Sequence, residues 1–167
     1  MAVDVHPSEF AYAFSYAKTS DVIGWGLAPF LPSPDEGTAL NDWYREGEDR
    51  MVAAGRLVGT RQDGLNFTDD MTSAILALVN PGLVFLSQRK AGDGVRTLSV
   101  HAKGSTFIGL TRRPDGMFEM TRYADMIAAA GACAAFVGAS LTALATEARI
   151  EADKDTLEAL GKQIAMH

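Results

Sequence analysis

The chain has 167 residues, of which 47% are hydrophobic and 22% charged, and its formal net charge is −6. That length is typical of one domain with a sizeable core, and the composition excludes a disordered chain. An acidic balance argues against a nucleic-acid partner, because affinity for phosphate backbones comes largely from Lys and Arg. The basic pairs Arg89-Lys90 and Arg112-Arg113 stand beside turn signals, and we interpret them as solvated strand ends.

Cysteine usage and the first residues indicate the compartment. Cys133 is the single cysteine, which excludes an internal disulfide and a thiolate metal cluster. It stands in an alanine-rich apolar run, where a buried and unreactive thiol is expected. The first ten residues, which include Asp4, His6 and Glu9, lack the basic and apolar regions of a secretory signal peptide. We therefore expect a soluble protein of the reducing cytoplasm.

The first predicted element is a helix that Pro7 and Ser8 open and that extends through Lys18. Its apolar residues recur at helical spacing, namely Phe10, Phe14 and Ala17. Glycines and prolines then interrupt residues 20–37, which predicts a loop. Because this loop also carries Trp25 and Phe30, we expect it to pack onto the body of the domain.

Two further helices are predicted before residue 82. The second helix covers residues 38–54 and ends at Gly55, which suits a left-handed stop. A small hairpin is expected over residues 57–67. Thr68 is a good N-cap for the third helix, since the acidic pair Asp69-Asp70 complements its positive dipole end. The third helix is expected to end at Asn80-Pro81-Gly82.

From residue 83 the hydrophobic period changes to two, which predicts a four-stranded antiparallel meander. The expected strands are 83–90, 96–103, 106–112 and 117–121. The second strand alternates between an apolar set and a polar set, namely Leu98, Val100 and Ala102 against Thr97, Ser99 and His101. We therefore expect one sheet face to lie against helices and the other to face water or a partner. His101 is interpreted as a surface residue.

The rest of the chain, residues 124–165, is predicted to be helical, beginning with a helix from Met126 to Leu144. Residues 126–146 are uncharged and long enough to cross a bilayer. Nearly half of them are alanine, which gains little on transfer to lipid, so a buried helix is preferred over a membrane span. Small residues would let this helix pack closely, within one chain or across a homodimer, namely Gly131, Ala135, Gly138 and Ala139.

The order of elements predicts the fold class. Helices over residues 7–80 are followed by an antiparallel sheet over 83–121 and by helices over 124–165. Separate runs of helices and strands are typical of an α+β fold. We expect one such domain over residues 1–167, with the long C-terminal helices packed on one face of the sheet.

No catalytic or metal-binding constellation is recognised in the sequence. His6 and His167 stand near the termini, and no second ligand is in register with His101. Gly138-Ala139-Ser140 lacks the final glycine of a nucleophile elbow, and a helix N-terminus explains the acidic pair Asp69-Asp70. We therefore expect a protein that is not an enzyme and that uses no cofactor or metal.

Residues 51–122 show a longer pattern. Met51–Val58 leads through a short loop to the helix capped by Thr68, and three strands and the Asp115-Gly116 turn follow. This pattern resembles the half-repeat of the EspG family of type VII secretion chaperones, whose members look like two such halves related by a pseudo-twofold axis. Since this chain has one half only, the resemblance implies a homodimer that rebuilds the two-half arrangement around a protein client. No binding residue of that family carries over.

Two functional hypotheses remain open. The first is a cytosolic chaperone or adaptor that acts as a homodimer and holds a protein partner, which suits a small acidic domain with a free sheet face. The second is a small-molecule-binding or sensory domain, with a pocket lined by Trp25, Phe30, Trp43 and Tyr44. The simpler interpretation of these four aromatic residues is that they belong to the core. The identity of a client or ligand is not determined by the sequence.

Overall fold

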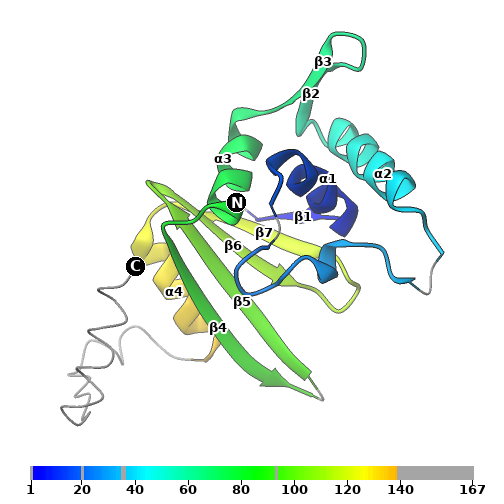
Figure 1. Cartoon of the computed structure of the whole chain (residues 1–167). Helices are drawn as coiled ribbons and strands as arrows, with labels where there is room; N and C mark the ends of the chain where they lie inside the picture. Colours follow the sequence, from blue (N-terminus) through cyan, green and yellow to red (C-terminus); the bar gives the residue numbers. More distant parts are fainter. Residues whose placement is uncertain (1, 20, 35–36, 93, 139–167) are drawn as a thin grey trace.

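The computed structural model describes residues 2–19, 21–34, 37–92 and 94–138 of the chain (Figure 1). Its elements are, in chain order, β1 (Ala2–Val5), α1 (Pro7–Ala17), the 3-10 turn η1 (Ala28–Phe30), α2 (Leu40–Ala53), β2 (Leu57–Thr60), β3 (Gly64–Phe67), α3 (Asp69–Val79), β4 (Leu83–Ala91), β5 (Gly94–Lys103), β6 (Thr106–Arg112), β7 (Phe118–Tyr123) and α4 (Met126–Phe136). Helices and antiparallel strands are combined as the predicted α+β class requires.

Within the described residues, the main sheet has five strands in the order β1-β7-β6-β5-β4, all antiparallel to their neighbours. The four strands of the expected meander are present, but the prediction of a four-stranded sheet is wrong because β1 adds a fifth. Val5 pairs with Phe118 and Ala2 with Thr121. With only four residues, β1 gives too short a periodic signal to be recognised, and its pairing with β7 defines it.

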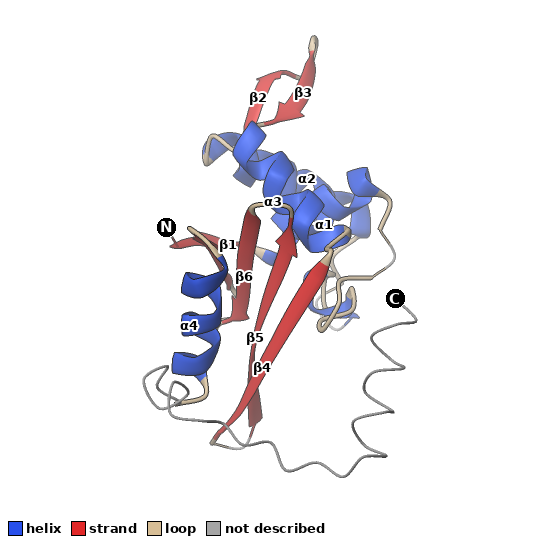
Figure 2. Ribbon diagram, turned by 90° about the vertical axis from the view of Figure 1, so that its left-hand side faces the viewer, coloured by secondary structure: helices blue, strands red, loops and turns tan. Residues whose placement is uncertain are grey.

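Both faces of this sheet are covered, which corrects the expectation of one free face. Figure 2 shows α4 on one side of the sheet and α1, α2 and α3 on the other. On the α4 side, Ala129 packs in a buried cluster with Leu98, Val100 and Phe107. On the other side, the cluster contains β6 residues such as Ile108 together with residues of α1, α3 and the loop after α1.

Helices α1 and α2 lie close together beside the sheet. The start of α1 is a capping box, in which the His6 side chain accepts from Ser8 N and the Glu9 side chain accepts from His6 N. Helix α2 meets this start at Gly47, where an added Cβ would lie 2.1 Å from the Ser8 carbonyl oxygen. Glycine at this position therefore sets the distance between the two helices.

The predictions between residues 55 and 82 are confirmed. The strands β2 and β3 pair as a two-stranded hairpin. Gly55 adopts a φ of 67°, the left-handed conformation that stops α2. The Thr68 Oγ1 accepts from Met71 N at 3.3 Å and caps α3.

The helix predicted from Met126 to Leu144 is shorter in the structure, where α4 ends at Phe136. It begins at Asp125, whose Oδ1 accepts from Ala128 N at 2.8 Å. Gly138 takes a φ of 79°, which no right-handed helix tolerates, so the described helix cannot continue through it. The helices predicted beyond residue 138 lie outside the described residues. None of the described helices has the length and apolar character needed to cross a membrane.

Candidate functional site

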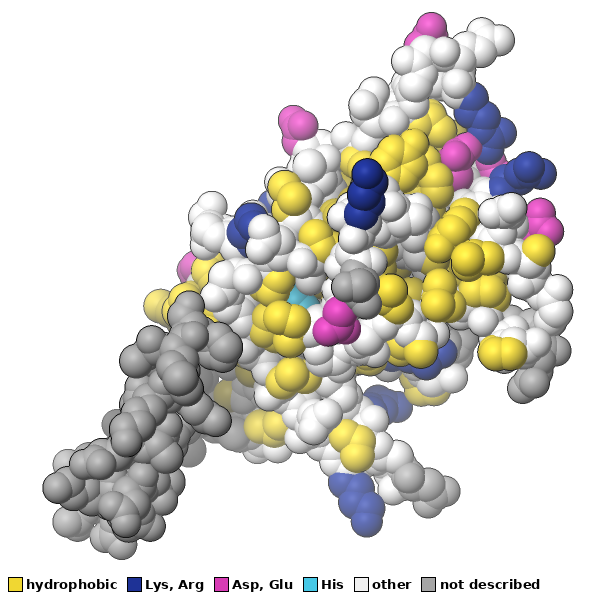
Figure 3. Space-filling model, viewed as in Figure 1, with side chains coloured by type: hydrophobic (Ala, Val, Ile, Leu, Met, Phe, Trp, Pro, Cys, Tyr) yellow, Lys and Arg dark blue, Asp and Glu magenta, His cyan; other side chains and the backbone are white. Residues whose placement is uncertain are grey.

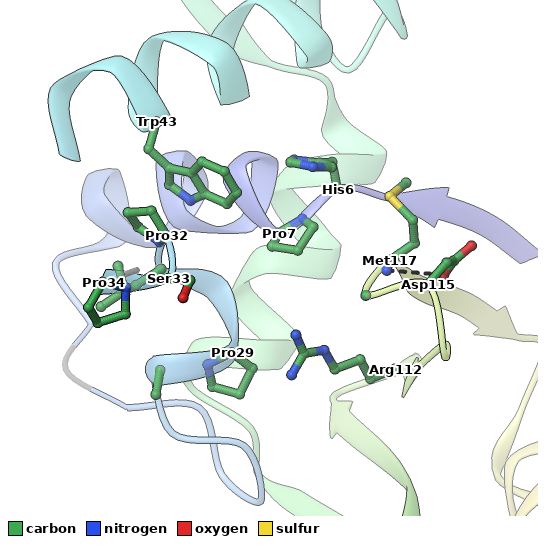
Figure 4. Close-up of a pocket in the computed structure, with 13 residues that line it drawn as sticks. His6, Pro7, Pro29, Pro32, Ser33, Pro34, Trp43, Arg112, Asp115 and Met117 are labelled. Carbon is green, nitrogen blue, oxygen red and sulfur yellow. Dashed lines mark hydrogen bonds between the residues drawn. The ribbon is translucent and has the colours of Figure 1, made fainter. Parts of the chain in front are cut away.

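A surface cavity of about 510 Å³ lies where the start of α1, the loop around η1, helix α2 and the β6–β7 turn meet (Figure 4). A cavity of this size is in the range of sites that hold small ligands. It brings together an aromatic wall, a proline-rich wall and a charged side. Segments up to about 110 residues apart in the chain therefore form one site, between His6 and Met117.

The aromatic wall consists of Trp43 from α2 and His6 from the N-cap of α1. Their ring centroids lie 5.2 Å apart with the planes tilted by 52°. The Trp43 Nε1 donates to the carbonyl oxygen of Phe30 at 2.9 Å, which holds the indole against the loop. This hydrogen bond leaves a face of the indole available to line the cavity, as Figure 4 shows.

His6 is neutral at pH 7 in this environment. Burial lowers its pKa from 6.5, and the nearby Arg50 lowers it further, against smaller opposing effects of Glu46 and Glu9. Nδ1 lies 2.7 Å from Ser8 Oγ and 3.3 Å from the backbone N of Ser8, whose N–H it accepts. With Nδ1 as an acceptor, the proton of the neutral ring is assigned to Nε2. That nitrogen makes no hydrogen bond to another described residue, so it is a donor available to a ligand.

Prolines form the second wall. Pro29 lies in η1, and Pro32 and Pro34 follow it in the chain. Proline fixes φ and has no backbone N–H, so this wall is rigid and offers mainly apolar surface and carbonyl oxygens. Phe30, which is fully buried, anchors the segment to the core.

The charged side comes from the end of β6 and the following turn. Arg113 forms ion pairs of 2.7 Å with Asp4 and with Asp115, and Asp115 Oδ1 also accepts from Met117 N at 3.2 Å. The neighbouring Arg112 forms no ion pair with any described residue. Its guanidinium carbon lies 5.9 Å from the centre of the Phe118 ring, and Figure 4 shows the side chain extending toward Pro29 across the cavity. The cavity thus carries a positive charge without a carboxylate partner among the described residues.

The four aromatic residues expected to line one pocket are distributed over three places. Trp43 lines the cavity of Figure 4. Phe30 and Tyr44 border a separate cavity of about 280 Å³ beside the end of α1. Trp25 borders a third hollow with Arg96 and packs against Phe118 at 5.4 Å between ring centroids. The structure therefore does not bring the four together.

Two residues of the cavity were missed by sequence reasoning. His6 is not among the predicted site residues because it stands near a terminus, yet it caps α1 and contacts Trp43. The sequence Pro7-Ser8-Glu9 directly after it is a helix-start pattern that could have indicated this role. Arg112 is an exposed residue at the end of β6, as its interpretation as a solvated strand end requires. No local signal shows that it also lines the cavity, because the other walls come from the distant loop around η1.

Away from this cavity, a row of hydrogen-bonded polar side chains is buried on one face of the sheet. His101, predicted to lie at the surface, is 0% exposed, and this expectation is wrong. Its Nε2 lies 2.9 Å from Ser99 Oγ, which also accepts from Trp25 Nε1 at 2.7 Å. Its Nδ1 has no partner in the described part of the chain, and burial lowers its pKa to about 4. The loop that carries Trp25 therefore buries the polar side of β5.

The residues proposed for a dimer helix lie partly on α4. Gly131 is half-buried and Ala135 is exposed, while Gly138 is exposed just after the helix end. Ala139 lies outside the described residues. Cys133 is half-buried and unpaired, so the expectation of a fully buried thiol is not met.

No protein-family model, no curated protein and no solved structure matches this chain. The similarity of residues 51–122 to the EspG family therefore stays an expectation. Within residues 2–138, apart from the few positions not described, His, Cys, Asp and Glu form no group of three or more that could hold a metal ion.

Proposed function

We propose that the protein is a non-enzymatic protein-binding module, a cytosolic chaperone or adaptor, that acts as a homodimer. The proposal rests on the apolar character of the outward side of α4. No residue of this helix is charged, and Ile127 is 77% exposed, beside the exposed Met126. A surface helix of a monomer normally presents polar side chains to water, so an uncharged exposed side supports a contact with another protein.

A second copy of the chain is the occupant that suits this side of α4. The exposed residues Ala128 and Ala135 are small, and Gly131 lies between them in the helix. Small side chains allow two helix axes to approach closely, and the same patch on both subunits gives a closed twofold dimer. Self-association would remove Ile127 from water in both subunits, which contributes roughly 1.5–3 kcal/mol for each side chain that is fully buried.

The free edge of the sheet supports the binding of a further partner. The nine-residue strand β4 lies at the end of the strand order, paired with β5 alone among the described strands. Leu83 and Leu86 on this strand are 45% and 48% exposed, and Figure 3 shows hydrophobic side chains along β4. An edge strand offers unpaired backbone groups to which an extended segment of a client can add as a further strand.

The homodimer is tested by light scattering after size exclusion at micromolar concentration. The wild-type chain is expected at twice the monomer mass, and Ile127→Glu at the monomer mass, because a charge in an apolar interface is not solvated. Val52→Glu is the matched control, since Val52 is an aliphatic residue on α2 that is 45% exposed. A monomeric wild type, or an Ile127→Glu variant that stays dimeric, would show that α4 is not the interface.

The client is tested with the full-length chain as bait in the soluble fraction of its native host. We expect one protein at fixed stoichiometry with the wild type, and its loss when Leu83 and Leu86 are both replaced by lysine. Capture that the two lysines leave unchanged would rule out the β4 edge as the binding surface. Absence of any stoichiometric partner would contradict the chaperone or adaptor role.

A second candidate function is favoured by the cavity of Figure 4. Its indole, imidazole and guanidinium groups are the kinds of polar and aromatic group that fix a small ligand in an otherwise apolar site. A small-molecule-binding or sensory role would use this cavity, with Trp43 as the one member of the four predicted aromatics that lines it.

A further inference from the structure

We propose that the cavity beside Trp43 binds a carboxylate group attached to a flat apolar body, with Arg112 holding the carboxylate. This inference rests on the second candidate function and specifies the chemistry of its ligand. It concerns a different surface from the α4 dimer contact, so each can fail without the other.

The charge of the ligand follows from the ion pairs around the cavity. Arg113 takes both neighbouring carboxylates, Asp4 and Asp115, at 2.7 Å each. Arg112 is left with five N–H donors and a full positive charge at the cavity, without an ion pair to a described residue. Since arginine binds carboxylates through two parallel hydrogen bonds, an anionic ligand with this planar geometry is the one that completes the site.

The other walls define the rest of the ligand. The face of Trp43 and the rings of Pro29 and Pro32 offer flat apolar surfaces, against which an aromatic or aliphatic ring can stack. The Nε2–H of His6 adds a neutral donor. A cavity of about 510 Å³ holds a carboxylic acid of roughly drug size or less, and it also holds the last two residues of a peptide with a free C-terminus.

The test follows the indole N–H signals of the full chain by NMR, since Trp25 and Trp43 are its two tryptophans. The probes are 3-phenylpropanoate and its amide, together with the dipeptide N-acetyl-Ala-Phe with a free or amidated C-terminus. We expect the carboxylate probes to shift the Trp43 signal in a saturable manner and to leave the Trp25 signal unchanged. The Trp43→Phe variant assigns the two signals.

Arg112→Gln is expected to weaken binding of the carboxylates by about 10- to 100-fold, because it removes the charge-assisted hydrogen bonds that the guanidinium donates to the carboxylate. Arg89→Gln is the matched control, because it removes the same charge from an exposed arginine that lies over Phe136 on the other side of the sheet. A far-UV circular dichroism spectrum and a urea midpoint like those of the wild type show that each variant is folded.

The outcomes distinguish the two kinds of carboxylate ligand from each other and from the absence of a carboxylate site. Tighter binding of 3-phenylpropanoate than of the dipeptide with a free C-terminus identifies a small-molecule ligand. The reverse order identifies a peptide C-terminus, and both results support the carboxylate site. Equal binding of acids and amides would overturn the role of Arg112 while leaving ligand binding intact. Absence of any shift at millimolar probe would overturn both this inference and the small-molecule function.

Discussion

The imidazole of His101 and the hydroxyl of Ser99 are both buried on β5, and both face the loop after α1 rather than water. The Trp25 Nε1–H donates to Ser99 Oγ, so one donor from the loop satisfies part of this polar pair. Two arrangements of protons fit the contact of 2.9 Å between His101 Nε2 and Ser99 Oγ, because Nε2 can accept from the hydroxyl or donate to it. The neutral ring is favoured by burial, which lowers the pKa of His101 to about 4. Burial therefore couples the protonation of a single side chain to the stability of the whole domain.

Protonation of His101 is predicted to destabilise the fold in mild acid. Its pKa is about 4 in the folded chain and 6.5 in the unfolded chain, so between these values the unfolded state binds more protons. The stability from the neutral ring is complete above pH 6.5 and is lost as the pH falls toward 4. From pH 7 to pH 5, urea unfolding should show a loss of about 2 kcal/mol relative to His101→Gln.

The comparison with His101→Gln isolates this residue. The pKa of His6 is also lowered, and carboxylates begin to protonate below pH 5, but these groups are present in both proteins. Parallel stability profiles of the wild type and the variant between pH 5 and 7 would contradict the assigned role of His101.

The capping box of α1 also depends on an ion pair formed by distant residues. Glu9 is 4% exposed and pairs with Arg56, which follows the end of α2 and also donates to the carbonyl oxygen of Asp4 at 2.7 Å. Arg56 thereby connects β1, α1 and the segment that leads into β2. A buried carboxylate needs such a partner, because its charge is otherwise poorly solvated.

At the scale of elements, the close contact between α1 and α2 determines which residue position 47 can hold. Gly47 lies inside α2, where alanine would raise helix propensity by about 1 kcal/mol. The contact has the opposite effect, because the added Cβ would lie 2.1 Å from the backbone oxygen of Ser8. Backbone cannot move aside as a flexible side chain can, so the two helices would have to separate.

Gly47→Ala is therefore predicted to destabilise the protein by about 2 kcal/mol or more, measured by urea unfolding. Gly94→Ala is the matched control, since the space around a Cβ at Gly94 is open and its φ lies outside the left-handed region. The control is expected to change stability by less than about 0.5 kcal/mol. If the two variants were equally stable, α1 and α2 would not be packed at this distance.

At the scale of the whole molecule, the loop around η1 joins the helical layer to the sheet. Phe30 is 0% exposed, and its ring centroid lies 4.7 Å from Phe118 of β7 and 5.1 Å from Phe14 of α1. The same loop supplies the proline wall of the cavity and the Trp25 that covers β5. The candidate site is therefore built on a segment that belongs to the core.

Phe30→Ala is predicted to lower the free energy of unfolding by about 3–5 kcal/mol, the usual result of removing a buried aromatic ring. Because the loop connects the two layers, tryptophan fluorescence and far-UV circular dichroism should shift to the same lower urea midpoint. Leu31→Ala, at a residue that is 40% exposed, serves as the control and should cost much less. Separate transitions by the two probes would mean that the loop is not part of one cooperative unit.

Local signals alone determined many of the elements of this protein. The Thr68 cap, the stop at Gly55 and the meander from residue 83 were predicted because a cap, a positive φ and a two-residue period depend on neighbouring residues. Of the residues predicted to line a pocket, Trp43 alone lines this cavity. His6 and Arg112 become site residues through contacts with segments that are distant in the chain.

Tertiary structure alone decided what covers each surface. A two-residue period shows which side of a strand is apolar, but it does not show that Trp25, 74 residues before Ser99, buries the polar side of β5. It likewise does not show that β1 extends the sheet, since a strand of four residues is stabilised by the pairing with β7 rather than by its own pattern. Burial and pairing are properties of two segments together, and for that reason only the folded chain defines the cavity and the buried histidine.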